Sequence, residues 1–189
     1  MRGAKLFVIA AAGLLMASCG PALTLNPLFE ESELVLDPAL LGTWGEGETF
    51  MKFECGDRKT YKLTYRDGTK ESVFEAKLGQ LDGQLFMDIY PVDQEGSEGG
   101  NEAYAPLVPM HTIMKVEIED DQLVLYLLDS DWVQKQLDEG GLQLDAEHVL
   151  KTGDNLFITL STDRLQDLVR NHAYEDEAFP RSDPLPRIE

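Results

Sequence analysis

Alternation of apolar and polar residues dominates the middle of the chain. From residue 49 to residue 90, apolar side chains recur at nearly every second position, which is the period of a strand with one buried face. Asp67-Gly68 and Asp82-Gly83 interrupt this alternation, and Asp-Gly favours the tight turn of a β-hairpin. Strands are predicted for residues 42–46, 49–55, 60–66, 72–78, 84–90, 111–119, 123–128 and 155–160. About eight strands in succession predict an all-β protein, and local hairpins favour an up-and-down antiparallel barrel.

Helical patterns are fewer and come mostly late in the chain. Asp37 and Pro38 predict a single helical turn, with Asp37 as its cap. Residues 131–137 have helical spacing, and residues 162–172 carry one apolar stripe, which predicts a C-terminal helix. Three prolines and few apolar residues follow, so residues 174–189 are predicted to form a disordered tail.

The amino terminus has the three parts of a secretory signal peptide. Arg2 and Lys5 are positively charged, and residues 6–16 form an apolar run. This run is shorter than the ~20 apolar residues that a spanning helix requires. Residues 1–18 are therefore predicted to be removed on export.

Met16-Ala17-Ser18-Cys19 resembles the lipobox of bacterial lipoproteins. The resemblance implies diacylglycerol on the Cys19 sulfur, cleavage before Cys19 and acylation of the new amino group. Several acyl chains together give stable membrane anchoring, which a single chain does not. Gly20 stands where Asp commonly retains such proteins in the inner membrane, so the resemblance favours the outer membrane. Residues 19–37 are then expected to be a lipidated tether; the alternative is an ordinary signal peptide in which Cys19 is incidental.

Gly42-Thr43-Trp44 opens the first predicted strand directly after the helical turn. This placement resembles the G-x-W signature of lipocalins and related calycin barrels, and the similarity of architecture covers about residues 38–172. It implies a lipocalin-like barrel domain at 38–173 with Gly42 and Trp44 as structural residues. It also implies that Trp44 closes one end of the barrel and that Arg164 packs over its ring.

Aromatic and aliphatic residues on the predicted strands are candidates for lining an apolar ligand pocket, since such pockets often occupy barrel mouths. The candidates are Phe53, Tyr61, Leu63, Tyr65, Phe74 and Phe86. The alternative is that they fill the core, because a barrel of about eight strands is just wide enough for its own side chains.

Composition argues against several other functions. The chain has 16 basic and 35 acidic residues, a formal net charge of −19, which repels nucleic acid. The sequence contains no G-x-S-x-G, H-E-x-x-H or C-x-x-C motif and no Gly-rich phosphate loop, so no enzyme and no cofactor are predicted. His111, His148 and His172 are too widely spaced for a metal motif, and the acidic run 93–102 lacks the spacing of a calcium loop. Cys55 is expected to be a small buried hydrophobe.

The leading hypothesis is a non-catalytic envelope lipoprotein that binds a small apolar ligand in its barrel. The alternative is a structural or assembly lipoprotein that acts through a protein–protein face, and an enzyme ranks third. An open apolar barrel mouth would favour the first hypothesis, and a filled barrel with an exposed apolar patch would favour the second.

Overall fold

The computed structural model describes residues 20–92, 110–140, 148–152 and 155–188, and most of its regular structure is β-sheet. The helices are α1 (Ser130–Glu139) and α2 (Thr162–His172), with 3-10 turns at η1 (Glu31–Glu33) and η2 (Pro38–Leu40). The strands are β1 (Leu23–Thr24), β2 (Gly42–Glu46), β3 (Thr49–Cys55), β4 (Thr60–Asp67), β5 (Lys70–Leu81), β6 (Gln84–Pro91), β7 (His111–Glu119), β8 (Gln122–Leu127), β9 (Val149–Thr152), β10 (Asn155–Ile158) and β11 (Leu185–Pro186).

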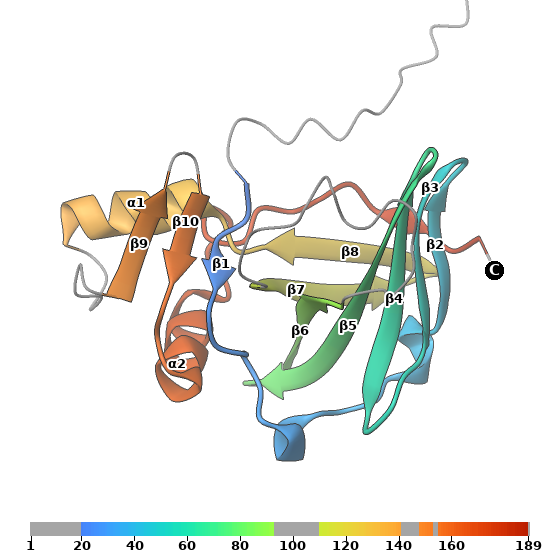
Figure 1. Cartoon of the computed structure of the whole chain (residues 1–189), viewed down its shortest axis with the longest axis horizontal. Helices are drawn as coiled ribbons and strands as arrows, with labels where there is room; N and C mark the ends of the chain where they lie inside the picture. Colours follow the sequence, from blue (N-terminus) through green and yellow to red (C-terminus); the bar gives the residue numbers. More distant parts are fainter. Residues whose placement is uncertain (1–19, 93–109, 141–147, 153–154, 189) are drawn as a thin grey trace, which may run out of the picture.

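Strands β2 to β8 pair in sequence order, each antiparallel to the next, and the sheet they form is strongly curved (Figure 1). The predicted β-rich class and the up-and-down succession are therefore confirmed. The sheet is not closed into a barrel, however. The C-terminal segment lies between its two ends: β11 pairs with β8, and the Ile188 amide donates to the Thr43 carbonyl oxygen of β2 at 2.7 Å.

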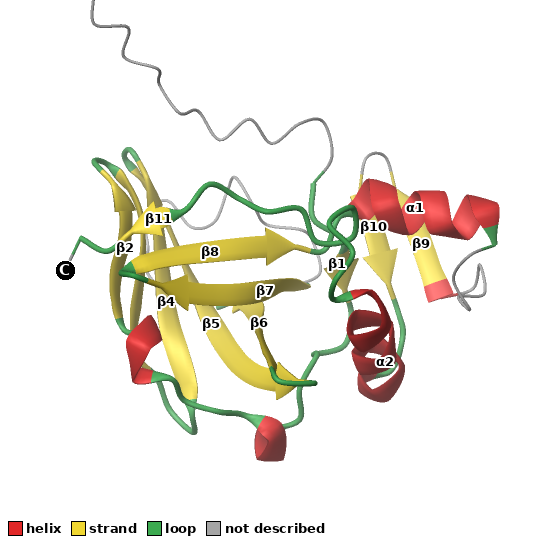
Figure 2. Ribbon diagram, turned by 180° about the vertical axis from the view of Figure 1, so that it is seen from behind, coloured by secondary structure: helices red, strands yellow, loops and turns green. Residues whose placement is uncertain are grey.

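The first residues of β7 carry a second, smaller extension of the sheet. They pair with β1, which runs parallel to β10, and β10 pairs with β9. The sequence alternation does not predict β1, β9 or β11, because two to four residues are too few to establish a period. Figure 2 shows this extension beside the two helices, at the opposite end of the molecule from β2.

Two apolar cores lie on opposite faces of the curved sheet, as the alternation of side chains requires. The inner core consists of Leu40, Trp44, Phe53, Tyr61, Leu63, Ala76, Leu78, Met87, Met114, Val116, Leu123 and Leu125. The outer core joins the other face of β6–β8 to the N-terminal segment, both helices and the residues after α2. Consecutive residues of one strand thus enter different cores: Phe86 belongs to the outer core and Met87 to the inner one.

Local capping signals explain where the helices begin and end. The Asp37 carboxylate accepts from the Ala39 amide, and Asp129 accepts from the Trp132 amide, so each aspartate satisfies an amide that has no partner within its helix. Helix α1 ends at Glu139 and is capped by Gly140, whose φ of 68° is the left-handed conformation that glycine tolerates. The predicted C-terminal helix 162–172 is confirmed as α2.

The segment after Cys19 is part of the folded body, so the expected tether at residues 19–37 is wrong for the described residues 20–37. Ala22 and Leu28 are completely buried, and Phe29 and Leu34 are 2% exposed. The Ala22 amide donates to the Leu128 carbonyl oxygen at 2.8 Å. Low periodicity and prolines suggest a tether, but contacts with distant segments hold this stretch in place.

The segment after α2 is also ordered, which corrects the predicted disorder of the tail within residues 174–188. Ala178 is completely buried and Phe179 is 1% exposed. The Phe179 ring packs edge-to-face on Phe86, with ring centroids 5.9 Å apart. The prolines are compatible with this path because it is extended and makes few strand hydrogen bonds.

Gly79 on β5 provides a test of how the N-terminal segment is docked. A Cβ atom added there would lie 2.4–2.6 Å from three atoms of the buried Phe29 ring. Gly79→Ala is therefore expected to lower the free energy of unfolding by about 1–3 kcal/mol, the usual cost of overpacking. Urea unfolding measures the change, and Gly20→Ala is the control, since a Cβ there meets nothing within 4 Å. Equal stability of the two variants would contradict the docking of Phe29 on β5.

Candidate functional site

The residues predicted to line a ligand pocket do not form one set. Phe53, Tyr61 and Leu63 lie in the inner core and are 1–2% exposed. Phe74 is partly buried against the same core, and Tyr65 is intermediate in exposure. The sixth candidate, Phe86, lies on the other face of the sheet and contacts Phe179, so it cannot line the same cavity.

The inner core is packed with side chains. Its twelve residues are each no more than 4% exposed. Tyr61 packs edge-to-face on Phe53 with ring centroids 6.4 Å apart, and its hydroxyl accepts from the Asp37 amide at 2.7 Å. The hydroxyl also donates to the Asp37 carbonyl oxygen at 3.1 Å, and burial raises the pKa of this hydroxyl. Tyr61 thus closes the core against the turn before β2.

Surface hollows lie outside this core. One, of about 610 Å³, is open to solvent beside α1 and is lined by Trp132, Pro180 and several carboxylates. Another, of about 310 Å³, lies where Asn26 and Glu30 meet the start of α2. Both belong to the surface of the outer core, and neither contains a residue predicted for ligand binding.

Trp44 occupies the structural position that the sequence predicts. It is completely buried in the inner core, and its indole Nε1 donates to the Leu40 carbonyl oxygen at 2.8 Å. Gly42, two residues earlier, has φ 127°, a conformation that side chains other than glycine rarely adopt. The positive φ of Gly42 and the burial of Trp44 therefore explain why these two residue types stand in the Gly-x-Trp motif.

The arginine over Trp44 is a different one from that expected. The Arg187 guanidinium lies over the indole with its carbon 4.0 Å from the ring centroid. It also donates to the carbonyl oxygens of Leu41 and Ala39. Arg164 is instead on α2, where its Nη1 is 3.2 Å from His148 Nε2, and α2 lies at the far end of the molecule from β2 (Figures 1 and 2). The expectation for Arg164 is therefore wrong, because the C-terminal segment, rather than the helix, reaches β2.

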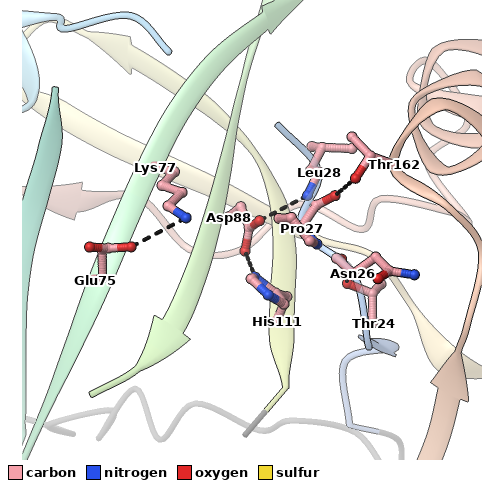
Figure 3. Close-up of polar contacts among 9 residues, drawn as sticks. All are labelled: Thr24, Asn26, Pro27, Leu28, Glu75, Lys77, Asp88, His111 and Thr162. Carbon is pink, nitrogen blue, oxygen red and sulfur yellow. Dashed lines mark hydrogen bonds and ion pairs between the residues drawn. The ribbon is translucent and has the colours of Figure 1, made fainter. Parts of the chain in front are cut away.

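The most distinctive polar arrangement in the described structure is the buried pair Asp88 and His111. Asp88 is 1% exposed and His111 is 7% exposed, and Asp88 Oδ1 is 2.7 Å from His111 Nδ1. The second carboxylate oxygen accepts from the Leu28 amide at 2.9 Å (Figure 3). The His111 ring is also tilted against Tyr90, with centroids 4.6 Å apart. Both oxygens of a carboxylate removed from water are thus engaged, as burial requires.

This pair joins β6 and β7 to the N-terminal segment. Two neighbouring hydroxyls form hydrogen bonds with the main chain of the same segment. Thr24 Oγ1 donates to the Asn26 carbonyl oxygen, and Thr162 Oγ1 donates to the Pro27 carbonyl oxygen, each at 2.8 Å (Figure 3). These hydroxyls already donate to main-chain carbonyls. They are therefore poorly placed to act as nucleophiles with His111 as the base that takes their proton. The arrangement therefore fastens residues 24–28 to the sheet and to α2.

Sequence reasoning missed Asp88 as a site residue. The available signal is its position between Phe86 and Tyr90 on one face of a predicted strand, followed by His111 at the start of the next predicted strand. A carboxylate on an apolar face needs a partner. Which of the three histidines supplies it depends on strand register, which the sequence does not specify.

The remaining sequence candidates concern metal binding, the lone Cys55 and the acidic run. In the described ranges, no group of three or more His, Cys, Asp or Glu side chains could hold a metal ion. Cys55 is exposed, which corrects its predicted burial, because β3 ends there at the edge of the inner core. The acidic run 93–102 lies outside the described residues. None of the helices in the described part of the chain is long and apolar enough to span a bilayer.

Comparison with known proteins finds no relative: no family model, no curated protein and no solved structure matches this chain.

Proposed function

We propose that this protein is an exported lipoprotein of the cell envelope, anchored through Cys19, that acts on a partner protein through its outer surface. Export and anchoring are supported by the apolar leader and the Met16-Ala17-Ser18-Cys19 sequence. Gly20 favours the outer membrane as its location. The mode of action is supported by the packed inner core.

The packed inner core is the observation that carries the choice between a ligand and a partner. A ligand in the sheet would have to displace side chains such as Phe53 and Leu63, which are buried among their neighbours. Interiors of native density leave few voids larger than a water molecule. The aromatic residues that suggest a pocket in the sequence are therefore better explained as core.

A lipocalin-like architecture remains part of this proposal. The succession of β2 to β8, the buried Trp44 at the start of β2 and the arginine over its ring support it. Fold-level similarity does not carry a ligand with it, because function belongs to sites rather than to folds.

The charge of the chain indicates what kind of partner fits. A formal net charge of −19 gives a surface that attracts cationic groups and repels nucleic acid. Attraction between exposed charges is screened at high salt, since the Debye length falls to about 3 Å at 1 M. A partner held by this surface is therefore expected to present basic residues and to dissociate as salt is raised.

Cys19→Ser tests the proposed lipidation and membrane anchoring. The variant is expected to lose its acyl groups and to leave the detergent phase in a phase-partitioning experiment, because the anchoring energy is in the buried acyl chains. Intact-mass spectrometry of the wild-type mature chain should show the added mass of the acyl groups at Cys19. Cys55→Ser is the control, since it removes a thiol but leaves the anchor. A mature chain with an unmodified Cys19 would contradict the proposal.

The mode of action is tested in two measurements on the mature protein. Native mass spectrometry of protein purified from envelopes should show no retained apolar molecule. Cross-linking in intact cells should recover a basic envelope protein, and its recovery should fall as ionic strength rises before cross-linking. A retained apolar ligand together with no salt-sensitive partner would favour the ligand hypothesis instead.

A further inference from the structure

Gly20, the first residue that the structure describes, is already held by contacts with the folded body. The Gly20 carbonyl oxygen accepts from the Ser130 hydroxyl at 2.7 Å, and Pro21 forms a β-bridge with Asp129. The Ala22 amide donates to Leu128 at 2.8 Å, and Ala22 is completely buried. Three consecutive residues are thus held against the end of β8 and the start of α1.

This attachment limits how far the body can lie from a lipid anchor on Cys19. Consecutive Cα atoms are about 3.8 Å apart, so Gly20 lies within about 4 Å of the anchored residue. A flexible linker of ~18 residues would instead reach roughly 20–25 Å and allow free rotation. Without such a linker, the surface around Gly20 has to lie at the depth of the lipid headgroups.

Resting on the proposed lipidation of Cys19, we infer that the N-terminal end of α1 and the end of β8 form a face that contacts the membrane surface. Asp131, in the first turn of α1, is an exposed side chain of this face. The 3-10 turn η1, the lower of the two blue turns in Figure 1, lies on the opposite side of the molecule from the start of the described chain (Figures 1 and 2). The η1 side therefore points away from the bilayer and is available to other proteins.

The lipid class follows from the charge of this face. Asp131 is exposed at the N-terminal end of α1, and Asp138 and Glu139 are exposed at its C-terminal end, with Lys135 as the one basic residue of that helix. The whole chain also carries a formal net charge of −19. Lys135 is itself paired with Glu177 at 3.0 Å. Anionic headgroups would be repelled by this end of the body, so the face fits zwitterionic phospholipids.

Fluorescence quenching in vesicles tests the orientation on the lipidated mature chain. A Cys55→Ser background receives one new cysteine, Asp131→Cys or Glu31→Cys, for a fluorescent label. Each protein is reconstituted into zwitterionic vesicles that contain lipids with a nitroxide on the headgroup. A domain of this size has a radius of gyration of about 15 Å, so the two labels should differ clearly in depth. We expect a several-fold loss of fluorescence at position 131 and little loss at position 31.

Insertion of twelve Gly and Ser residues after Cys19 is the matched control. Such a linker extends over about 20 Å, so the difference between the two positions should largely disappear. Replacing a third of the lipid with an anionic one should weaken quenching at position 131. The inference would be overturned by equal quenching at both positions in the chain without the linker. It would also be overturned by a difference that remains after the linker is inserted, or by stronger quenching in anionic vesicles. Mass spectrometry of the same samples separates failure of this inference from failure of the proposed lipidation, because a chain without acyl groups contradicts the lipidation itself.

Discussion

Trp44→Ala is expected to lower the free energy of unfolding by about 3–5 kcal/mol, the usual cost of truncating a core aromatic residue. Trp44 is completely buried, and its indole Nε1 donates to the Leu40 carbonyl oxygen at 2.8 Å. Truncation removes the transfer free energy of the ring, leaves a cavity in the inner core and leaves Leu40 without its donor. Chemical denaturation followed by circular dichroism measures the loss.

Two arginine variants show whether the covering of Trp44 is as the structure describes. Arg187→Ala removes a guanidinium over the indole and its hydrogen bonds to Leu41 and Ala39, so a loss of about 1–3 kcal/mol is expected. Arg164→Ala, on the exposed side of α2, should change stability by less than about 0.5 kcal/mol. The reverse order would restore the expectation from the sequence resemblance. Unaltered stability of Trp44→Ala would refute both the burial and the lipocalin-like proposal.

Asp88→Ala is expected to cost about 3 kcal/mol, because it leaves two buried donors without an acceptor, at roughly 1–3 kcal/mol each. The donors are the Leu28 amide and the Nδ1 atom of His111, which lies 2.7 Å from the carboxylate. Since Leu28 belongs to the N-terminal segment, this segment should open before the rest of the protein does. Hydrogen exchange measured by mass spectrometry should show faster exchange of residues 22–28 than in the unmodified protein.

Asp88→Asn is the matched control for this experiment. Its side-chain oxygen can still accept one hydrogen bond, so its loss of stability should lie between those of the unmodified protein and Asp88→Ala. A double-mutant cycle with His111→Gln measures the coupling, which contacting buried groups usually show at 0.5–3 kcal/mol. Additive effects of the two substitutions, or unchanged exchange of residues 22–28, would show that the pair does not fasten the segment.

Local patterns were sufficient for most of the sheet. The alternation in residues 49–55 and 111–119 predicts β3 and β7 with the observed bounds, because a half-buried strand imposes a period of two on its own residues. The predicted cap Asp37 is equally local, since an N-cap bonds an amide two or three residues away. Phe53, Tyr61 and Leu63 were correctly placed on one face by the same alternation.

Errors arose where contacts between distant residues decide the outcome. Cys55 continues the inward alternation of β3 but is exposed, because the core ends before the strand does. Phe86 joins the outer core because β6, unlike β3 and β4, is covered on both faces. The alternation in the sequence marks two faces but does not say which faces will be covered.

The sequence by itself determined the antiparallel succession from β2 to β8, both helices and the burial of Trp44, and it alone supports the export that we propose. These follow from interactions within a few residues, or from the division of each strand into two faces. Only the tertiary structure decided that residues 20–37 and 174–188 belong to the body, that Arg187 covers Trp44 and that Asp88 binds His111. The physical reason is that these segments have weak patterns of their own: buried anchors such as Ala22 and Phe179 hold them only once the sheet has formed the surface against which they pack.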